Sequence, residues 1–591
     1  MKKYIALLSL TLMFSSCGED FLTVTTPNAI GVNDFPATAN DLESVMVGAY
    51  ANMHAYGLYG HCILAKGFQC WDHTQDMAWQ GTQTWIQLCQ NDAQASDLFL
   101  SQIWKDAYKG IQRTNNVLEI LEAYKAGTSS IKVTIAANAL TEYEAQAKFL
   151  RAWYYYNLIT IWGEKFIISG AGRDAKGVPI FKNVAASLAD ASVPRSTVGE
   201  VWDFIIQDLK EAETLLASTN RTAWTGADRY KINVWGVRGF LGKVYAVTDD
   251  WTNAKTYLKN VIDNSGKSLV SFSTYSNMFN AFPESNEFNT ESLIEIPMTT
   301  SNTDNSNNDL STGSWHGMIQ APSVNITATG VPATGGWSNV FPHQANLRRF
   351  GWAQAHYFPP GVTSTNRSGV RANYEAESNA IRLAKSVDPR LWVSFLQPYV
   401  DKIGTGTTLG TALEYVGHAA DGVPAQMPAW SFKKFEYLQG RQSAVRNFGA
   451  NFYLLRLAEV YLLYAESLVE TGGSSAEALE YINKVHRRAY DLPINTPSVR
   501  DYASLTAPTL AGDSNYGNNP LRYERYVEFF GEGMKWIDTR RWQDGAVEAA
   551  YYGAVRGGII NWKDSDYAQP IPTIEIENNA AIDFDVQNEG Y

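Results

Sequence analysis

The sequence predicts a predominantly α-helical protein, in which helical hairpins form a scaffold around a long irregular region. Apolar residues recur at helical spacing over about 41–265 and again over about 450–545. Between these parts, over about 268–450, the periodicity fades and Asn, Ser, Thr, Gly and Pro become frequent, as in residues 301–308. A chain of 591 residues, 45% of them hydrophobic, can bury a large core.

The N-terminus has the features of a bacterial secretory leader that ends at a cysteine. Two lysines precede an apolar run over residues 5–14, which is too short to span a bilayer. Small serines then lead to Cys17. We therefore expect a signal peptide over 1–16, acyl chains on Cys17, and a lipidated N-terminus and tether over 17–40. The alternative is an ordinary signal peptide with an incidental cysteine.

Four helices are predicted in the first part of the scaffold. Thr197 is the expected N-cap of the fourth helix, and Glu200 is its capping-box partner. Before it, residues 164–195 form an excursion that contains Gly and Pro. The first helix is expected to start near Asp41. The other three are expected to span about 97–121, about 135–161 and about 197–216.

Two segments match the spacing of tetratricopeptide repeats, in which small residues let two antiparallel helices approach closely. In residues 232–262, Gly242 stands where such a small residue is needed, and Leu258 belongs to the second helix. The other segment predicts helices over 454–469 and 476–486, joined by a glycine-containing turn. Tetratricopeptide-like hairpins are therefore expected in both parts of the scaffold.

The charge balance excludes one class of partner. Acidic residues outnumber basic ones by 60 to 48, which gives a formal net charge of −12. Nucleic-acid binding depends largely on Lys and Arg contacts to phosphates, so it is not expected here. No phosphate-binding glycine loop, nucleophile elbow or His-Glu-x-x-His motif is present, so we expect neither a cofactor nor an enzyme.

Aromatic residues are abundant, with 18 Trp, 32 Tyr and 25 Phe. Most of these rings are expected in the core, and the surplus can form flat platforms for ligands. The tryptophans at helical spacing among apolar neighbours are assigned to the core: Trp104, Trp153, Trp202 and Trp235. The pair Arg540-Arg541 is expected to make structural ion pairs and to act at a helix end.

Three cysteines follow Cys17 in the chain: Cys62, Cys70 and Cys89. His61 and His73 lie near the first two, but the spacing matches no compact zinc-ligand pattern, so no metal site is expected. The prediction is either buried thiols or one local disulfide between Cys62 and Cys70.

Six blocks of the sequence form a specific set: residues 17–22, 144–158 with 162–163, 388–391, 454–466, 522–542 and 570–572. Their spacing covers nearly the whole chain, and the set resembles the SusD/RagB family of Bacteroidetes outer-membrane lipoproteins, which are starch-utilisation-system D-like proteins. Residues 163–167 depart from the family's usual Gly-x-Val-Pro-Leu, and Met534 or Lys535 stands where Arg is usual.

The resemblance implies a single SusD-like domain over 41–591 on the cell surface, attached to the outer membrane by its lipid alone. It further implies that the protein captures oligosaccharides, has no catalytic activity, and delivers its ligand to a SusC-like TonB-dependent transporter. Two alternatives stay open. One is a member of the same family that captures peptides, and the other is a tetratricopeptide scaffold that binds only protein partners.

Candidate glycan contacts come from two parts of the chain. Sugar rings stack their C–H faces on aromatic rings while their hydroxyls bond to polar side chains. Residues 71–85 interleave aromatics with short polar groups, and in the family this loop and the irregular region commonly form the binding face. The candidates are Trp79, Trp85, Asp76 and Gln80 from the first part, and Trp315, His316 and Trp337 from the second.

A glycosidase needs two carboxylates about 5 to 9.5 Å apart. Glu142 with Glu144, or Asp72 with Asp76, are the pairs that would have to supply them. Without another catalytic motif, we expect a binding protein.

Overall fold

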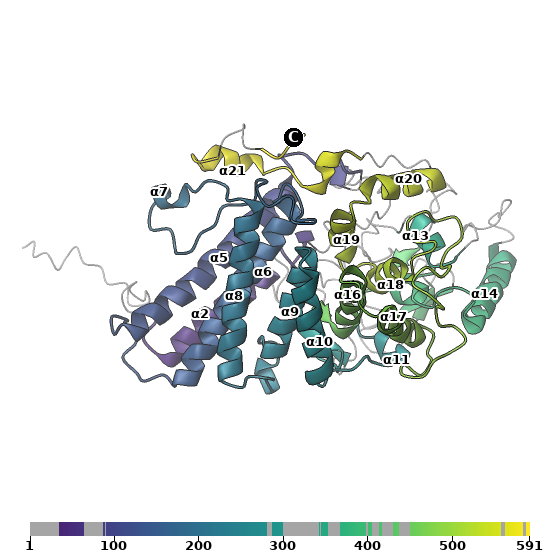
Figure 1. The fold of residues 1–591 in the computed structure, drawn as a ribbon, viewed down its shortest axis with the longest axis horizontal. Helices are drawn as coiled ribbons and strands as arrows, with labels where there is room; N and C mark the ends of the chain where they lie inside the picture. Colours follow the sequence, from purple (N-terminus) through teal and green to yellow (C-terminus); the bar gives the residue numbers. More distant parts are fainter. Residues whose placement is uncertain are drawn as a thin grey trace, which may run out of the picture.

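The computed structural model describes thirteen stretches of the chain, and most of their residues are helical (Figure 1). No helix in these stretches is both long enough and apolar enough to cross a membrane. The stretches are residues 35–63, 87–88, 90–280, 286–299, 342, 344–352, 367–397, 400–404, 413–415, 430–435, 449–556, 562–582 and 587–591.

Most helices of the first half lie together at one end of the molecule, and most helices of the last quarter lie beside them (Figure 1). In the first half these are α2 (Ala39–Ala51), α5 (Leu98–Lys125), α6 (Ala137–Trp162), α7 (Leu188–Ala191), α8 (Val198–Ser218), α9 (Val234–Val247), α10 (Trp251–Asn264) and α11 (Phe272–Tyr275). In the last quarter they are α16 (Leu457–Glu470), α17 (Ser475–Ala489), α18 (Pro520–Phe529), α19 (Met534–Trp542), α20 (Gly545–Arg556) and α21 (Thr573–Asn578). Short 3₁₀ turns are η2 (Asn52–His54), η4 (Gly226–Asp228) and η6 (Asp564–Tyr567).

The four helices predicted for the first part of the scaffold are confirmed as α2, α5, α6 and α8. Their ends follow from local chemistry. Thr197 and Glu200 form the expected reciprocal capping box at α8. The Asp97 carboxylate accepts from the backbone N–H groups of Phe99 and Leu100 and so begins α5. Gly163 ends α6.

The hairpin of α9 and α10 shows why its small residue is needed. A Cβ added at Gly242 would lie 2.6 Å from the side chain of Leu258, so only glycine allows this separation of the two helices. The helices α16 and α17 form the second predicted hairpin. However, the predicted start at residue 454 was wrong, because Phe452–Arg456 is strand β6 and the helix begins at Leu457.

The error at β6 has a physical cause. An apolar run reads equally well as a buried strand or a buried helix, and here a distant segment decides. Strand β1 (Ser292–Ile296) pairs with β6 in an antiparallel two-stranded sheet. All five residues of β6 are buried.

The region that was expected to be irregular holds short elements and one longer helix. Helix α14 (Arg367–Ala384) was not predicted, because its sequence is mostly polar and lies within the long region rich in Asn, Ser, Thr, Gly and Pro. Two further two-stranded sheets pair β2 with β5 and β3 with β4. The remaining elements are α13 (Gln344–Arg349), α15 (Leu391–Ser394), β2 (Phe395–Leu396), β3 (Lys402–Gly404), β4 (Leu413–Tyr415) and β5 (Ser431–Phe432).

The core contains most of the predicted tryptophans. Trp104, Trp153 and Trp202 are buried, as expected. Trp235 is only half-buried and packs at the edge of the core, with the guanidinium of Arg238 5.0 Å from the centre of its ring. The assignment of Trp235 to the core was therefore wrong. Its ring lies at the edge of the core, where neighbouring side chains cover only part of it.

The pair at the end of α19 has the two expected roles. Arg541 forms ion pairs with Glu466 at 2.6 Å and with Asp538 at 2.8 Å. Arg540 donates hydrogen bonds to the carbonyl oxygens of Thr160 and Gly163, and so satisfies the C-terminal end of α6. The pair fastens α19 to two other helices.

Candidate functional site

A buried cluster of charged side chains joins strand β6 to helices of the last quarter. Arg390, beside α15, lies 2.6 Å from both Asp388 and Glu524. Arg456, the last residue of β6, lies 2.5 Å from Glu528. All of these side chains are almost fully removed from solvent. Three of the sequence blocks therefore meet in one place: residues 388–391, 454–466 and 522–542.

Two acids of this cluster, Glu524 and Glu528, are held in the ionised form. Burial alone raises the pKa of Glu524, but Arg390 and His486 outweigh burial and lower it to about 2. Burial likewise raises the pKa of Glu528, and its arginine neighbours, Arg488 first, hold it well below the usual range. Carboxylates that stay charged and paired cannot donate protons near neutral pH. The cluster therefore cross-links the fold and offers no acid–base pair.

The carboxylates considered for a glycosidase do not form a pair either. Glu142 accepts a hydrogen bond from Arg221 at 2.8 Å, and Glu144 pairs with Lys125 at 2.5 Å. Each is thus held by a separate cation. Asp72 and Asp76 lie outside the described residues.

The predicted glycan contacts also lie outside the described residues. These are Trp79, Trp85, Asp76, Gln80, Trp315, His316 and Trp337, and the same holds for Cys17. Cys62 is buried, whereas Cys70 and Cys89 are outside the described part. His61 stacks on Tyr56 with ring centres 4.7 Å apart. No group of His, Cys, Asp and Glu among the described residues could hold a metal ion.

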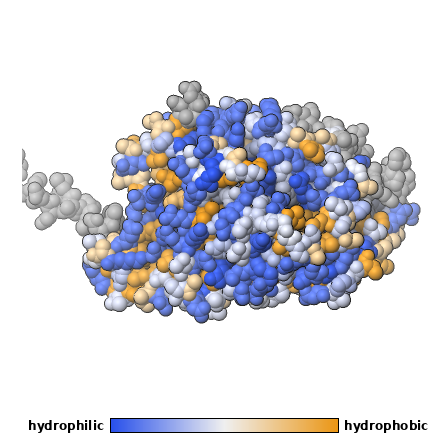
Figure 2. Space-filling model, in the orientation of Figure 1, coloured by the Kyte–Doolittle hydropathy of each residue, from blue (hydrophilic) through white to orange (hydrophobic). Residues whose placement is uncertain are grey.

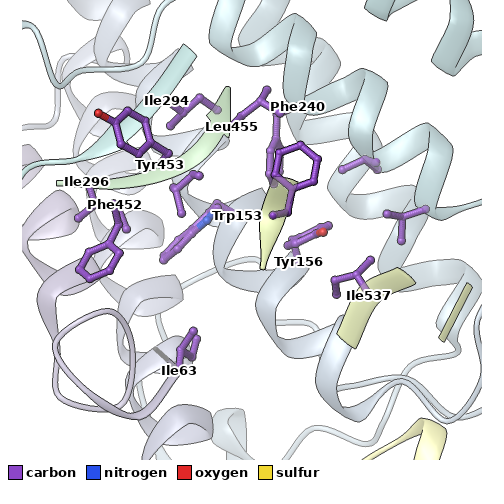
Figure 3. Close-up of a cluster of buried hydrophobic side chains, with 14 of the residues drawn as sticks. Ile63, Trp153, Tyr156, Phe240, Ile294, Ile296, Phe452, Tyr453, Leu455 and Ile537 are labelled. Carbon is purple, nitrogen blue, oxygen red and sulfur yellow. The ribbon is translucent and has the colours of Figure 1, made fainter. Parts of the chain in front are cut away.

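Several chain segments nevertheless leave the scaffold beside one aromatic cluster. Tyr59 packs against Trp153 at 5.8 Å and against Phe452 at 5.7 Å, and Phe435 lies 4.3 Å from Phe452. Figure 3 shows Ile63 near the same cluster, below Trp153 and Phe452. Residues 59–63 precede the stretch that holds Trp79 and Trp85, so this stretch starts at the cluster.

The stretch that holds Trp315 and Trp337 starts nearby. It follows residue 299, and the backbone N–H of Met298 donates to the side chain of Asn451 at 2.8 Å. Asn451 is the neighbour of Phe452 in the aromatic cluster. Both parts of the predicted glycan site therefore leave the scaffold close to the start of β6.

Buried polar contacts fix the chain before the first of these stretches. The backbone N–H of Gly57 and the side chain of Gln102 both donate to the buried Asp106 carboxylate, at 2.7 and 3.0 Å. Asn52 donates to the Asp106 carbonyl oxygen at 2.8 Å. A Cβ at Gly57 would lie 2.1 Å from the backbone of Gln102, so the chain approaches α5 as closely as glycine permits.

A groove of about 930 Å³ lies on another face of α5. Its floor is one stripe of α5 that runs from Leu98 to Asn115. One wall is residues 181–191, which we call the strap and which include α7. The other wall is α21 and the residue after it. Its volume lies within the usual range of ligand sites.

The groove was missed in the sequence because the strap was read only as a loop excursion. A signal was present in Leu188, a large apolar residue within the Ala- and Ser-rich segment 185–192. No local pattern, however, could show that α21, from the far end of the chain, forms the opposite wall.

Two family models match this chain. The model described as "SusD family" matches residues 290–591, and the model described as "Starch-binding associating with outer membrane" matches residues 20–246. Among curated relatives, a SusD-like protein of Bacteroides ovatus is 23% identical over 91% of this chain and 82% of its own length. SusD-like protein P25 of Formosa agariphila is also 23% identical, over 98% of both chains.

Solved structures have the same fold. A laminarin-binding SusD-like protein superposes with a TM-score of 0.63 at 21% identity, over 94% of this chain and all of its own. Surface glycan-binding protein A from Bacteroides thetaiotaomicron, in complex with laminarihexaose, gives a TM-score of 0.62 at 19% identity, over 93% of this chain and all of its own. The "SusD family" model covers just over half of the sequence, and this chain belongs to the SusD/RagB family.

Proposed function

We propose that this protein is a lipid-anchored receptor on the outer face of the outer membrane, which captures oligosaccharides and delivers them to a SusC-like TonB-dependent transporter. The observation that carries this proposal is the family membership, together with solved relatives named for binding laminarin or laminarihexaose that share the fold over more than nine-tenths of the chain. In this proposal the protein catalyses no reaction. Residues 17–40 are the lipidated tether, and residues 41–591 form one domain.

The geometry supports placing the ligand beside the start of β6. Both stretches that carry the candidate tryptophans begin next to the cluster around Phe452. Loops that carry binding residues on a rigid helical scaffold are a common arrangement in proteins. In the proposal, Trp79, Trp85, Trp315 and Trp337 stack on sugar rings, while Asp76, Gln80 and His316 bond to hydroxyls.

The test is calorimetric binding of the purified protein to laminarihexaose, starch oligosaccharides and a peptide digest. Binding of a glycan without release of shorter products supports capture without catalysis. Binding of the peptides alone favours the peptide-capturing alternative. If neither binds and the protein only co-purifies with a barrel transporter, the scaffold alternative holds. Mass spectrometry of the mature N-terminus checks the acyl chains on Cys17.

A further inference from the structure

The groove on α5 is held open by hydrogen bonds between its own walls. Asn115 on the floor donates to the Phe181 carbonyl oxygen of the strap at 3.0 Å. Trp104 on the floor donates to Glu575 of α21 at 3.1 Å. Asn579, just after α21, donates to the carbonyl oxygen of Val193, two residues beyond the strap, at 3.0 Å, which ties α21 to the end of the strap. The groove is therefore pre-formed.

Its rim exposes large apolar side chains from three different elements. Leu98 at the start of α5 is 64% exposed, Leu188 on the strap 89%, and Ile574 on α21 56%. Figure 2 shows hydrophobic residues over the part of the molecule where α7 and α21 lie. Exposed aliphatic side chains that gather around one hollow mark a surface that another apolar group can cover.

Two lysines of α5 line the floor of the groove, although the whole chain is acidic. Lys105 is exposed and forms no ion pair within the described part of the chain, and Lys109 lies one turn further along α5. Of the described residues that line the groove, Glu575 alone carries a carboxylate. Both of its oxygens already accept hydrogen bonds, from Trp104 and Asn579. An occupant with carboxylates next to aliphatic or aromatic side chains fits this surface.

The chain itself contains such a segment just after Cys17. It reads Glu19-Asp20-Phe21-Leu22, with a valine two residues later. We propose that residues 18–34 of the tether dock in the α5 groove. Phe21 and Leu22 then cover the aliphatic rim, and the two acids face Lys105.

The tether is long enough to reach the groove. The hydroxyl of Ser130, just beyond the end of α5, donates to the Pro36 carbonyl oxygen at 2.6 Å, so the described chain begins beside that end. Helix α5 has 28 residues and is about 42 Å long. The 17 residues of the tether span at most about 56 Å when extended. The tether can therefore run back along α5 to the groove.

Docking within one chain needs little intrinsic affinity. A tethered segment has an effective concentration of about 1 mM near its own site, so a dissociation constant in that range leaves the groove occupied for half of the time. The contacts must still offset the entropy lost when the segment becomes ordered. If Cys17 is acylated, docking also brings the folded body close to the membrane surface.

Two other occupants fit the groove less well. Oligosaccharides stack on open aromatic faces, whereas Tyr108 and Phe181 in the groove are half-buried and meet edge to face at 5.6 Å. A second copy of the chain would have to bring a complementary acidic and apolar surface. The tether supplies both properties within six residues.

Hydrogen–deuterium exchange on the processed lipoprotein in lipid nanodiscs tests the proposal. We expect the amides of residues 18–26 to exchange at least threefold more slowly than in the same peptide synthesised alone. Lys105→Glu and Leu188→Ser should each remove this protection. Combining Lys105→Glu with Glu19→Lys and Asp20→Lys should restore part of it. Lys182→Glu is the matched control, because this exposed lysine is on the strap but does not line the groove.

Three outcomes would overturn the proposal. The first is that the tether amides of the lipoprotein without substitutions exchange as fast as those of the isolated peptide. The second is protection that rises with protein concentration, which would assign the groove to a second copy. The third is protection of α5 by laminarihexaose while the tether exchanges freely, which would make the groove a glycan site. The first two outcomes leave glycan capture near β6 untouched. The third would move the glycan site to the groove but would still show glycan capture, so the two proposals can fail separately.

Discussion

The guanidinium of Arg456 lies 2.5 Å from the carboxylate of Glu528, and both side chains are almost completely buried. This contact joins the last residue of β6 to α18, two elements that are far apart in the sequence. A charge this deep is tolerated only while its partner is present, because desolvation otherwise outweighs any gain.

Replacing Arg456 by methionine should therefore destabilise the protein strongly. The change leaves Glu528, Glu291 and Glu532 without one of their cations. We expect a loss of about 3 to 5 kcal/mol in the free energy of unfolding, measured by urea denaturation.

Arg173→Met is the matched control for this variant. Arg173 pairs with Asp203 at 2.6 Å, but both side chains are well exposed, and such a pair contributes at most about 1 kcal/mol. If the two variants lose similar amounts of stability, the buried cluster has no special structural role.

Glycine-to-alanine changes at two helical positions should have opposite effects on the stability of the protein. At Gly242 the added Cβ would meet Leu258 at 2.6 Å, so we expect Gly242→Ala to cost about 1 to 3 kcal/mol. At Gly48, in α2, an added Cβ meets nothing within 4 Å, and alanine there should stabilise by about 0.5 to 1 kcal/mol. Thermal unfolding of both variants measures the difference. A neutral Gly242→Ala would show that α9 and α10 can move apart freely.

Glu295 predicts a pH dependence of stability. Burial raises its pKa to about 7, although Asn451 and the Phe288 N–H donate to its oxygens. In the unfolded chain the pKa of this carboxyl is near its ordinary value of 4.5. Between about pH 4.5 and pH 7, the folded state therefore holds a proton on Glu295 that the unfolded state has lost. Stability contributed by this group is present below that window and is lost as the pH rises through it.

Raising the pKa of Glu295 from 4.5 to about 7 changes the free energy of unfolding by roughly 3 kcal/mol across this pH range. Glu295→Gln should flatten the decline in unfolding free energy between pH 4.5 and 7, whatever its own absolute stability, because glutamine does not titrate. Denaturant unfolding at a series of pH values measures the slope. An equally steep slope in the variant would assign the decline to other groups.

Local signals in the sequence were enough to predict much of the helical scaffold. Thr197 and Glu200 are three residues apart and specify their helix start without help from the rest of the chain. Gly242 and Leu258 belong to one hairpin, so their contact also follows from spacing. These features could be read because each interaction spans only a few helical turns.

Features that depend on distant partners could not be read in the same way. Strand β6 was expected to be helical because its apolar run carries no information about its partner β1. Likewise, no local pattern shows that Arg390 reaches Glu524 on α18. The candidate glycan residues stay predictions, since they lie outside the described part of the chain and only the positions where their segments leave the scaffold are known.

The proposed glycan contacts can be tested one tryptophan at a time. An indole ring that stacks on a sugar behaves as a binding hot spot, so Trp79→Ala or Trp337→Ala should weaken glycan binding by roughly 1 to 3 kcal/mol. Isothermal calorimetry with the best oligosaccharide measures this loss, and circular dichroism checks that both variants stay folded. Trp235→Ala is the control, because this half-buried ring lies on scaffold helix α9 and should leave the affinity unchanged. If both Trp79→Ala and Trp337→Ala bind as tightly as the unmodified protein, the glycan lies elsewhere and the site assignment fails.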